Sequence, residues 1–161
     1  MRKLGKYMTK NLTPEILWVD ALSMIPGLGG ERGKFDLVLI GNVLSEIPTP
    51  NARELILNTL LERTKENGHL VIVEPGTPKG FWFLNDFWNL VIEKDRAELN
   101  IVAPCPHHHK CPMADKSDTW CHFKQTAYKY PKTIFPKHPD EMNQANEKFS
   151  YLIVKKGKTP A

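Results

Sequence analysis

The amino-acid sequence predicts an α/β fold in which helices connect parallel strands. Three observations support this class: branched apolar runs that suit buried strands, amphipathic or aromatic runs that suit helices, and a regular alternation of the two. A length of 161 residues is enough for one domain with a real core. The net charge of +4 is compatible with a nucleic-acid partner without indicating one. No apolar run approaches the length of a membrane span, so no membrane association is expected.

The first part of the chain is predicted to contain a short helix and then a buried strand. Residues 12–24 read LTPEILWVDALSM, with Thr13 placed to cap the helix and Pro14 suited to its first turn. The glycine-rich stretch 25–34 matches no phosphate-binding motif and is expected to be a connection. Residues 35–47 form a near-continuous apolar run rich in branched side chains, which is typical of a strand buried on both faces of a parallel sheet.

Two further helix–strand pairs follow in the sequence. Residues 51–68 predict an amphipathic helix that Asn51 caps and Asn67-Gly68 ends, and residues 69–76 predict a second buried strand. Residues 80–95 predict a helix whose aromatic side chains pack into the core. A third strand is expected at the sequence LNIVAPCP, where the chain runs into its cysteine-containing segment.

The last part of the chain is irregular until a final strand. The stretch between Pro104 and Lys148 is unusually long for a loop in a compact domain, and such loops are usually functional or disordered. The sequence KFSYLIVKKG alternates in character, as an antiparallel edge strand does. The predicted organisation is therefore four segments: helix and linker at 1–34, an α/β half-domain at 35–104, a cysteine-containing loop at 105–148, and a strand with a tail at 149–161.

The segment CPHHHKCPMADKSDTWCH, residues 105–122, contains all three cysteines of the chain. Cys105 and Cys111 have five residues between them, and Cys111 and Cys121 have nine. This spacing matches neither a zinc finger nor a bacterial ferredoxin. An odd number of closely spaced cysteines favours a metal or cluster over disulfides, with free loop thiols as the alternative.

A tetrahedral site on three cysteines needs one more ligand. The same segment offers His107, His108, His109 and His122. Any of these would complete a Cys3His zinc site, and His122 directly follows Cys121. The residues alone leave open which histidine binds, or whether any does.

A second candidate site lies at the expected carboxyl ends of the first two strands. Ligands of open parallel sheets bind outside these strand ends. Asn42 and Glu46 follow the first apolar run, and Glu74 ends the second. These three side chains are candidate cofactor-binding residues, although strand ends are commonly polar without binding anything.

Four segments in one order carry a resemblance to a known family: FDLVLIGNVLSEI, GHLVIVEPGTPKGF, APCPHHHKCPM and WCHFKQ. This series resembles the methyltransferase-like family of the mitochondrial small ribosomal subunit, called methyltransferase-like protein 17 in animals, together with its bacterial relatives. The resemblance extends from about Phe35 to Gly157. The string that begins APCPH and continues to WCHF is its most specific part.

The resemblance implies a Rossmann-like class I methyltransferase fold, of which this chain would hold the carboxyl half. It also implies a 4Fe–4S cluster, with Cys105, Cys111 and Cys121 matching the first three cysteine ligands. In the family the fourth cysteine lies further downstream, so the fourth ligand is expected outside this chain or at His122. The Gly-rich turn that binds S-adenosylmethionine does not occur ahead of Phe35, and this chain alone is not expected to bind that cofactor or transfer methyl groups.

The function implied by the resemblance is that of a small-subunit protein or assembly factor in the mitochondrial matrix. Its expected partners are small-subunit rRNA, ribosomal proteins and a companion chain that carries the missing half of the fold. Lys110, Lys124 and Lys129 are candidate RNA-binding residues because basic and aromatic side chains alternate near them. The alternatives are a fragment of an S-adenosylmethionine-dependent rRNA methyltransferase acting with a companion chain, and a Cys3His zinc module.

Overall fold

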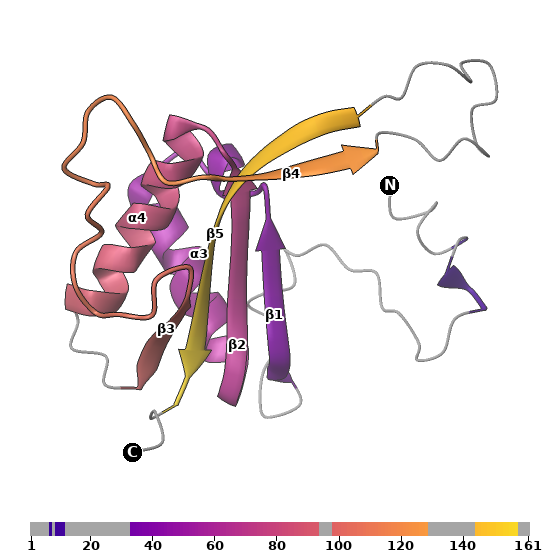
Figure 1. Cartoon of the computed structure of the whole chain (residues 1–161). Helices are drawn as coiled ribbons and strands as arrows, with labels where there is room; N and C mark the ends of the chain where they lie inside the picture. The colour runs from indigo at the N-terminus through magenta and orange to yellow at the C-terminus, as the bar shows by residue number, and fades with distance from the viewer. Residues whose placement is uncertain (1–6, 8, 12–32, 94–97, 129–143, 158–161) are drawn as a thin grey trace. The chain divides into compact units, whose positions relative to one another are not determined.

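The computed structural model describes residues 7, 9–11, 33–93, 98–128 and 144–157 (Figure 1). The chain forms two compact units, Met1–Lys34 and Phe35–Ala161. Every strand that the structure describes belongs to the second unit. The helix predicted at 12–24 lies outside the described residues, as does most of the connection that follows it.

The second unit is a mixed sheet whose strands follow the order β1-β2-β5-β3, with β4 paired to β5 outside this path. β1 (Phe35–Gly41) and β2 (Thr64–Pro75) are parallel, as predicted for the first two apolar runs. β5 (Gln144–Lys156) runs antiparallel to β2, to β3 (Leu99–Ala103) and to β4 (Phe123–Tyr128).

The final strand is antiparallel, as predicted, but the prediction that it forms an edge is wrong. β5 lies between β2 and β3, where Ile72 faces Leu152 on one side and Ile101 faces Val154 on the other. Leu152 and Val154 are buried against the helices. A strand with apolar side chains on both faces suits an interior position, which explains why β5 is not an edge.

α3 (Pro50–Arg63) and α4 (Pro78–Glu93) follow β1 and β2. The cap of α3 is Thr49 and not the predicted Asn51: the Thr49 hydroxyl accepts a hydrogen bond from Ala52 N at 3.2 Å. With Thr49 as cap, Pro50 takes the first helical position, where its missing N–H has no cost. Among the described residues, no helix is long and apolar enough to cross a membrane.

The boundary between α3 and β2 also differs from the prediction. The helix ends at Arg63, and Thr64 already belongs to the strand, where it is fully buried and pairs with Phe35. Asn67, predicted to end the helix, lies within β2 with a φ of 64° at an irregularity in the pairing. Asparagine tolerates this left-handed conformation, so the same residue that suits a helix end suits an irregular strand.

β4 was not predicted, because it lies inside the stretch expected to be one long loop. Its residues, FKQTAY, have no apolar run, and the side chains of Lys124, Gln125 and Thr126 are exposed. The strand forms through its pairing with β5, and the two make a ribbon that extends beyond the rest of the sheet (Figure 1). Edge pairing of this kind leaves little signal in the sequence.

Both long helices pack on the same face of the sheet (Figure 1). That face carries the core residues Ile40, Leu70 and Ile72, which are nearly inaccessible. On the opposite face of β1, Leu37 is 62% exposed and Leu39 is 67% exposed. A mixed α/β unit with one covered sheet face is compatible with part of a Rossmann-like fold, in which helices cover both faces.

Candidate metal centre

The three cysteines lie around one small cavity between α4, β5 and the cysteine loop, by which we mean residues 104–122. The cavity has a volume of about 40 Å³. All three thiols are partly buried, and none forms a disulfide. The complete lining is Phe81, Leu84, Asn85, Trp88, Pro104, Cys105, Cys111, Cys121, Ser150, Tyr151 and Leu152.

One stripe of α4 forms the helical wall of this cavity. Its members Phe81, Leu84, Asn85 and Trp88 follow the spacing i, i+3, i+4 and i+7, which places them on one face of a helix. All four are buried. The aromatic helix therefore serves the core, as predicted, and also supplies one wall of the candidate site.

Three side-chain hydrogen bonds fasten the cysteine loop to the sheet and to α4. Trp88 Nε1 donates to the carbonyl oxygen of His109 at 2.9 Å, and Trp120 Nε1 donates to that of Gly76 at 3.0 Å. On β5, the Ser150 hydroxyl donates to the carbonyl oxygen of Cys121 at 2.8 Å. These bonds give the carbonyls of His109, Gly76 and Cys121 a partner, and they position the backbone around the thiols.

Short local turns shape the loop itself. His107 N donates to the carbonyl oxygen of Cys105 at 2.8 Å, and Ala114 N donates to that of Cys111 at 3.0 Å. The His107 ring lies edge-on against Trp88, with centroids 5.3 Å apart. Each of the first two cysteines is thus held by a turn that begins at its own carbonyl.

Burial raises the pKa of the Cys121 thiol, and the neighbouring Cys111 and Cys105 raise it further. Burial disfavours a thiolate, and like charges nearby disfavour it again. A bound cation would reverse both effects, because metals bind the thiolate form. The raised pKa of Cys121 therefore reflects both its burial and the nearness of Cys111 and Cys105.

The described residues hold no group of three or more His, Cys, Asp or Glu side chains arranged to bind a metal ion directly. None of the four histidines of the segment lines the cavity. His122 instead forms a hydrogen bond between its Nδ1 and the carbonyl oxygen of Trp120, at 3.1 Å. The structure thus brings the three cysteines to one cavity without bringing a histidine to it.

Comparison with known proteins places the chain in a family. A family model described as the mitochondrial small ribosomal subunit Rsm22 matches residues 2–161. The chain belongs to the Rsm22 family. It is 35% identical over 131 residues to the human protein named ribosome assembly protein METTL17, mitochondrial, a match that covers 77% of this chain and 26% of the relative.

Two further relatives come from Schizosaccharomyces pombe and are named Rsm22-cox11 tandem proteins 1 and 2, mitochondrial. Each is 26% identical to this chain over 141 residues, which is 81% of this chain and 19% of the relative. The chain spans about a quarter or less of the length of the curated relatives it matches. The predicted family and the predicted mitochondrial localisation are confirmed, because the family and all three relatives carry mitochondrial names.

The residues of the second candidate site also lie close together in this Rsm22-family chain, but the central one, Glu74, makes a structural contact with the backbone. Glu74 is fully buried, and its Oε1 accepts hydrogen bonds from Val43 N at 3.1 Å and Leu44 N at 3.0 Å. These bonds fix the start of the short helix η2 (Leu44–Glu46). Asn42, with a φ of 54°, and Glu46 lie beside it and are exposed. A cofactor-binding role for these residues stays a prediction.

Burial raises the pKa of the Glu74 carboxyl, against the two backbone hydrogen bonds that lower it. Its second oxygen, Oε2, has no hydrogen-bond partner among the described residues. A buried carboxyl with one unpartnered oxygen favours the protonated state. The chemistry of Glu74 in this chain is therefore that of a cap for the backbone of η2.

Sequence reasoning missed Asn85 and Ser150, two polar side chains that line the cavity with the cysteines. Asn85 is 6% exposed, and its Oδ1 has no partner among the described residues. The signal for Asn85 was present, because it is the one polar member of the apolar stripe of α4 that lines the cavity. Ser150 carried no comparable signal, since its role depends on where β5 passes the loop.

The predicted RNA-binding lysines are spread over different parts of the structure. Lys110 is exposed on the cysteine loop, and Lys124 is exposed on β4 directly across from Lys148 on β5. Lys129 lies outside the described residues. The structure therefore places two of the three lysines on the surface and pairs one of them with a further lysine.

Proposed function

We propose that this chain is part of a mitochondrial small-subunit protein or assembly factor that binds rRNA as a scaffold and holds an iron–sulfur cluster, without methyl transfer by this chain alone. The observation that carries the proposal is the arrangement of Cys105, Cys111 and Cys121 around one cavity, fastened from α4 and β5. Membership of the Rsm22 family and the name of the human relative support the ribosomal role.

The donor set fits a 4Fe–4S cluster in part. Such clusters are held by cysteine thiolates, and each cysteine binds a different iron atom, so the sulfurs need not converge on one point. A fourth ligand is expected from outside the chain. When bound, the cluster would join Cys105, Cys111 and Cys121, three positions of the cysteine loop, to one another.

The uncovered face of the sheet supports a companion that supplies the other half of a Rossmann-like fold. Leu37 and Leu39 project from β1, which is an edge strand of the described sheet. An apolar edge strand with an open apolar face favours pairing with another chain or segment. A companion carrying the amino-terminal strands and helices would pair with β1 and cover this face.

The β4–β5 ribbon supports the RNA contact. Lys124 and Lys148 lie opposite each other in the ladder, and like charges in this position repel. A phosphate between the two side chains would neutralise both. The ring of Phe123 stacks against Phe149 across the same ribbon, with centroids 6.0 Å apart, and presents an aromatic surface on which a base can stack.

A zinc module is the alternative that a specific observation supports, because three thiols and the adjacent His122 are the donors of a Cys3His site. The hydrogen bond of Nδ1 to a carbonyl resembles the contact that orients metal-binding histidines. A methyltransferase fragment has less support, because the buried Glu74 is engaged with the backbone.

The test of the metal centre is anaerobic purification of the full chain, with quantification of iron, acid-labile sulfide and zinc and an absorption spectrum. We expect iron and sulfide together, a broad visible band, and loss of both elements when Cys105, Cys111 or Cys121 is changed to serine. His122→Ala is the matched control and should retain the iron. Zinc without sulfide, lost in His122→Ala, would establish the zinc module instead, and absence of both metals after reconstitution would contradict either site.

The scaffold role is tested by the salt dependence of binding to small-subunit rRNA. Each phosphate contact adds to the slope of affinity against salt concentration. Lys124→Ala/Lys148→Ala should flatten the slope, whereas Lys65→Ala should not, because Lys65 is paired with Asp36 at 2.9 Å. Equal slopes for all three proteins would remove the ribbon from the RNA interface.

A further inference from the structure

Asn85 is a buried polar side chain on the helical wall of the cysteine cavity. It belongs to the stripe of α4 that lines this cavity, and it is only 6% exposed. The other members of the stripe, Phe81, Leu84 and Trp88, are hydrophobic and also buried. A leucine would continue this apolar stripe. The chain therefore carries an amide at a position where packing alone favours a hydrocarbon side chain.

The core around the Asn85 amide does not satisfy it. Its Oδ1 is buried and has no hydrogen-bond partner among the described residues. Ser150 lines the same cavity and has a partner, because its hydroxyl donates to the carbonyl oxygen of Cys121 at 2.8 Å. A buried polar atom without a partner lowers the stability of a fold, so its presence requires an explanation. At the wall of a cavity lined by three thiols, a role in that site is such an explanation.

An amide suits a cavity whose sulfur atoms change their hydrogen-bonding role. It has an acceptor at one end and two N–H donors at the other, and a half-turn about its last torsion exchanges the two ends without changing its shape. The free thiols of Cys105, Cys111 and Cys121 can donate to an oxygen. Thiolates that hold a cluster have no proton to donate and can only accept.

We propose that the Asn85 side chain donates an N–H hydrogen bond to a sulfur atom of the loaded cysteine site and thereby tunes its reduction potential. The inference rests on the proposed function and adds to it a residue that is not itself a ligand. Hydrogen bonds to the sulfurs are among the factors that set the potential of a cluster. They stabilise the reduced state more than the oxidised state, because the reduced state carries more negative charge. The amide therefore raises the potential.

The surroundings of Asn85 strengthen this effect. Phe81, Leu84 and Trp88 are buried beside it and offer water little access to this wall of the cavity. A hydrogen bond is electrostatically stronger in such an apolar setting than in water. A single donor on this wall is therefore expected to have a measurable influence on the sulfurs.

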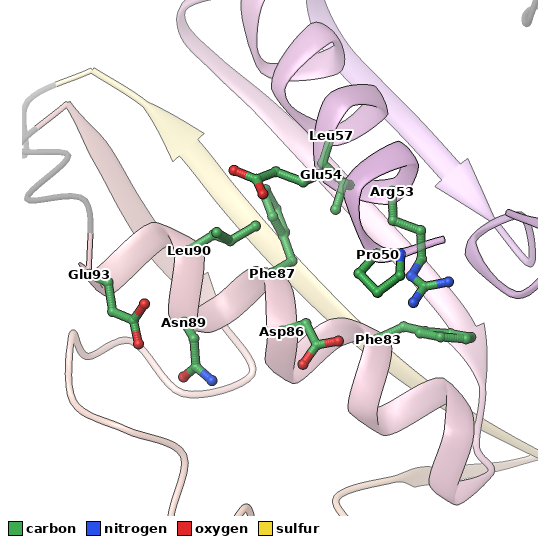
Figure 2. A pocket seen from close by; sticks show the side chains of 10 residues that line it. All are labelled: Pro50, Arg53, Glu54, Leu57, Phe83, Asp86, Phe87, Asn89, Leu90 and Glu93. Carbon is green, nitrogen blue, oxygen red and sulfur yellow. The ribbon is translucent and has the colours of Figure 1, made fainter. Parts of the chain in front are cut away.

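Asn89 provides a matched control one turn further along α4. It is half-buried and lines a separate groove between α3 and α4, together with Asp86 and Glu93 (Figure 2). This groove shares no lining residue with the cysteine cavity. The same change from asparagine to leucine at the two positions thus separates an effect on the sulfurs from a general effect on the helix.

The experiment compares the full chain with Asn85→Leu and Asn89→Leu after anaerobic reconstitution with ferrous iron, sulfide and a monothiol that supplies the fourth ligand. Protein-film voltammetry measures the reduction potential, with the electrode as the source of electrons. Asn85→Leu should shift the one-electron equilibrium about tenfold toward the oxidised cluster, which is a fall of about 59 mV. Asn89→Leu should leave the equilibrium within about twofold of that of the unmodified chain.

Two further measurements separate tuning from a structural role. In the metal-free chain, Asn85→Leu should unfold at the same urea concentration as the unmodified chain or at a higher one, because it removes a buried atom without a partner. Asn85→Asp keeps the shape of asparagine and replaces the donor by a negative charge, so at mildly alkaline pH it should lower the potential further than leucine does.

Equal potentials in the unmodified chain and both Asn85 variants would overturn the inference, as would an equal fall in Asn85→Leu and Asn89→Leu. A metal-free Asn85→Leu chain that unfolds at a lower urea concentration would also contradict it, by showing that the amide is bonded within the core. Failure of the proposed function gives a different result: the unmodified chain then holds no iron and sulfide, and the tuning role is lost together with the cluster.

Discussion

Trp120→Phe tests whether the cysteine loop is held by its indole hydrogen bonds. Trp120 Nε1 donates to the carbonyl oxygen of Gly76 at 3.0 Å, at the turn between β2 and α4, while the ring lies beside His122 with centroids 5.3 Å apart. Phenylalanine keeps an aromatic ring and removes the donor. The carbonyl of Gly76 then loses this partner, and only the loop is released from the turn.

The magnitude follows from one lost hydrogen bond. A single intramolecular hydrogen bond stabilises a protein by about 1 kcal/mol. Because about 1.4 kcal/mol corresponds to a factor of ten in an equilibrium constant, the population of the opened loop should rise about fivefold. Global stability should change by no more than the same amount, since the core residues around α4 are not touched.

The assay is amide hydrogen exchange, followed by mass spectrometry of peptides that cover residues 104–122. Exchange there should be about fivefold faster in Trp120→Phe, with the peptides of β2 and α4 less affected. Trp82→Phe is the matched control, because Trp82 is a tryptophan of α4 that is 42% exposed and does not line the cavity. Unchanged exchange over 104–122, or an equal increase in both variants, would refute the view that the indole bond fastens the loop.

Three further predictions concern residues that determine the stability of the fold around the sites. Burial raises the folded-state pKa of Glu74, so the folded state binds its proton more tightly than the unfolded state. The free energy of unfolding should therefore fall as the pH rises above about 4.3, the ordinary glutamate value, and through the raised pKa. Glu74→Gln should flatten this part of a pH series of urea titrations. Gly80→Ala should destabilise the fold by about 2 kcal/mol or more, since a Cβ there would lie 2.1 Å from the carbonyl oxygen of Pro75. Gly41→Ala is the control: nothing lies within 4 Å of its Cβ, so it should lower the free energy of unfolding far less in the same denaturation assay. Thr49→Ala should lower the free energy of unfolding by about 1 kcal/mol through loss of the α3 cap, and an unchanged thermal midpoint would argue against that role.

The parts of the fold that the sequence predicted are those with strong local patterns. β1, β2 and α4 were foreseen because their apolar runs are continuous or periodic. The apolar side chains of β2 and α4 are buried as expected, but the prediction that β1 is buried on both faces is wrong, because Leu37 and Leu39 are exposed. β4 was missed because its polar residues become a strand only by pairing with β5. The interior place of β5 was missed for the same physical reason: pairing partners are set by distant residues, and an alternating pattern does not distinguish an edge from the middle of a sheet.

The same contrast between local sequence patterns and tertiary contacts applies to the candidate site. The cysteines were evident from their crowding in the sequence, and the structure adds what surrounds them. Trp88 and Ser150 reach the loop from other elements, and Trp120 of the loop itself reaches the distant Gly76, so no spacing pattern in the sequence predicts these contacts. Glu74 was placed correctly at the strand end, but its complete burial, which makes it a backbone cap, depends on how η2 packs against it.

The central place of β5 has a consequence for how the molecule is assembled in time. β2 and β3 each pair with β5, and β4 has no other partner in the described sheet. During synthesis the β1–β2 pair, β3 and β4 therefore remain unjoined until β5 pairs with them. Contacts between such distant parts of a chain form slowly. Until β5 inserts, Ser150 cannot hold the carbonyl of Cys121, and the three thiols remain accessible to oxidants and to any metal donor. Insertion of β5 thus sets the moment at which the loop that carries the cysteines is fastened to the sheet.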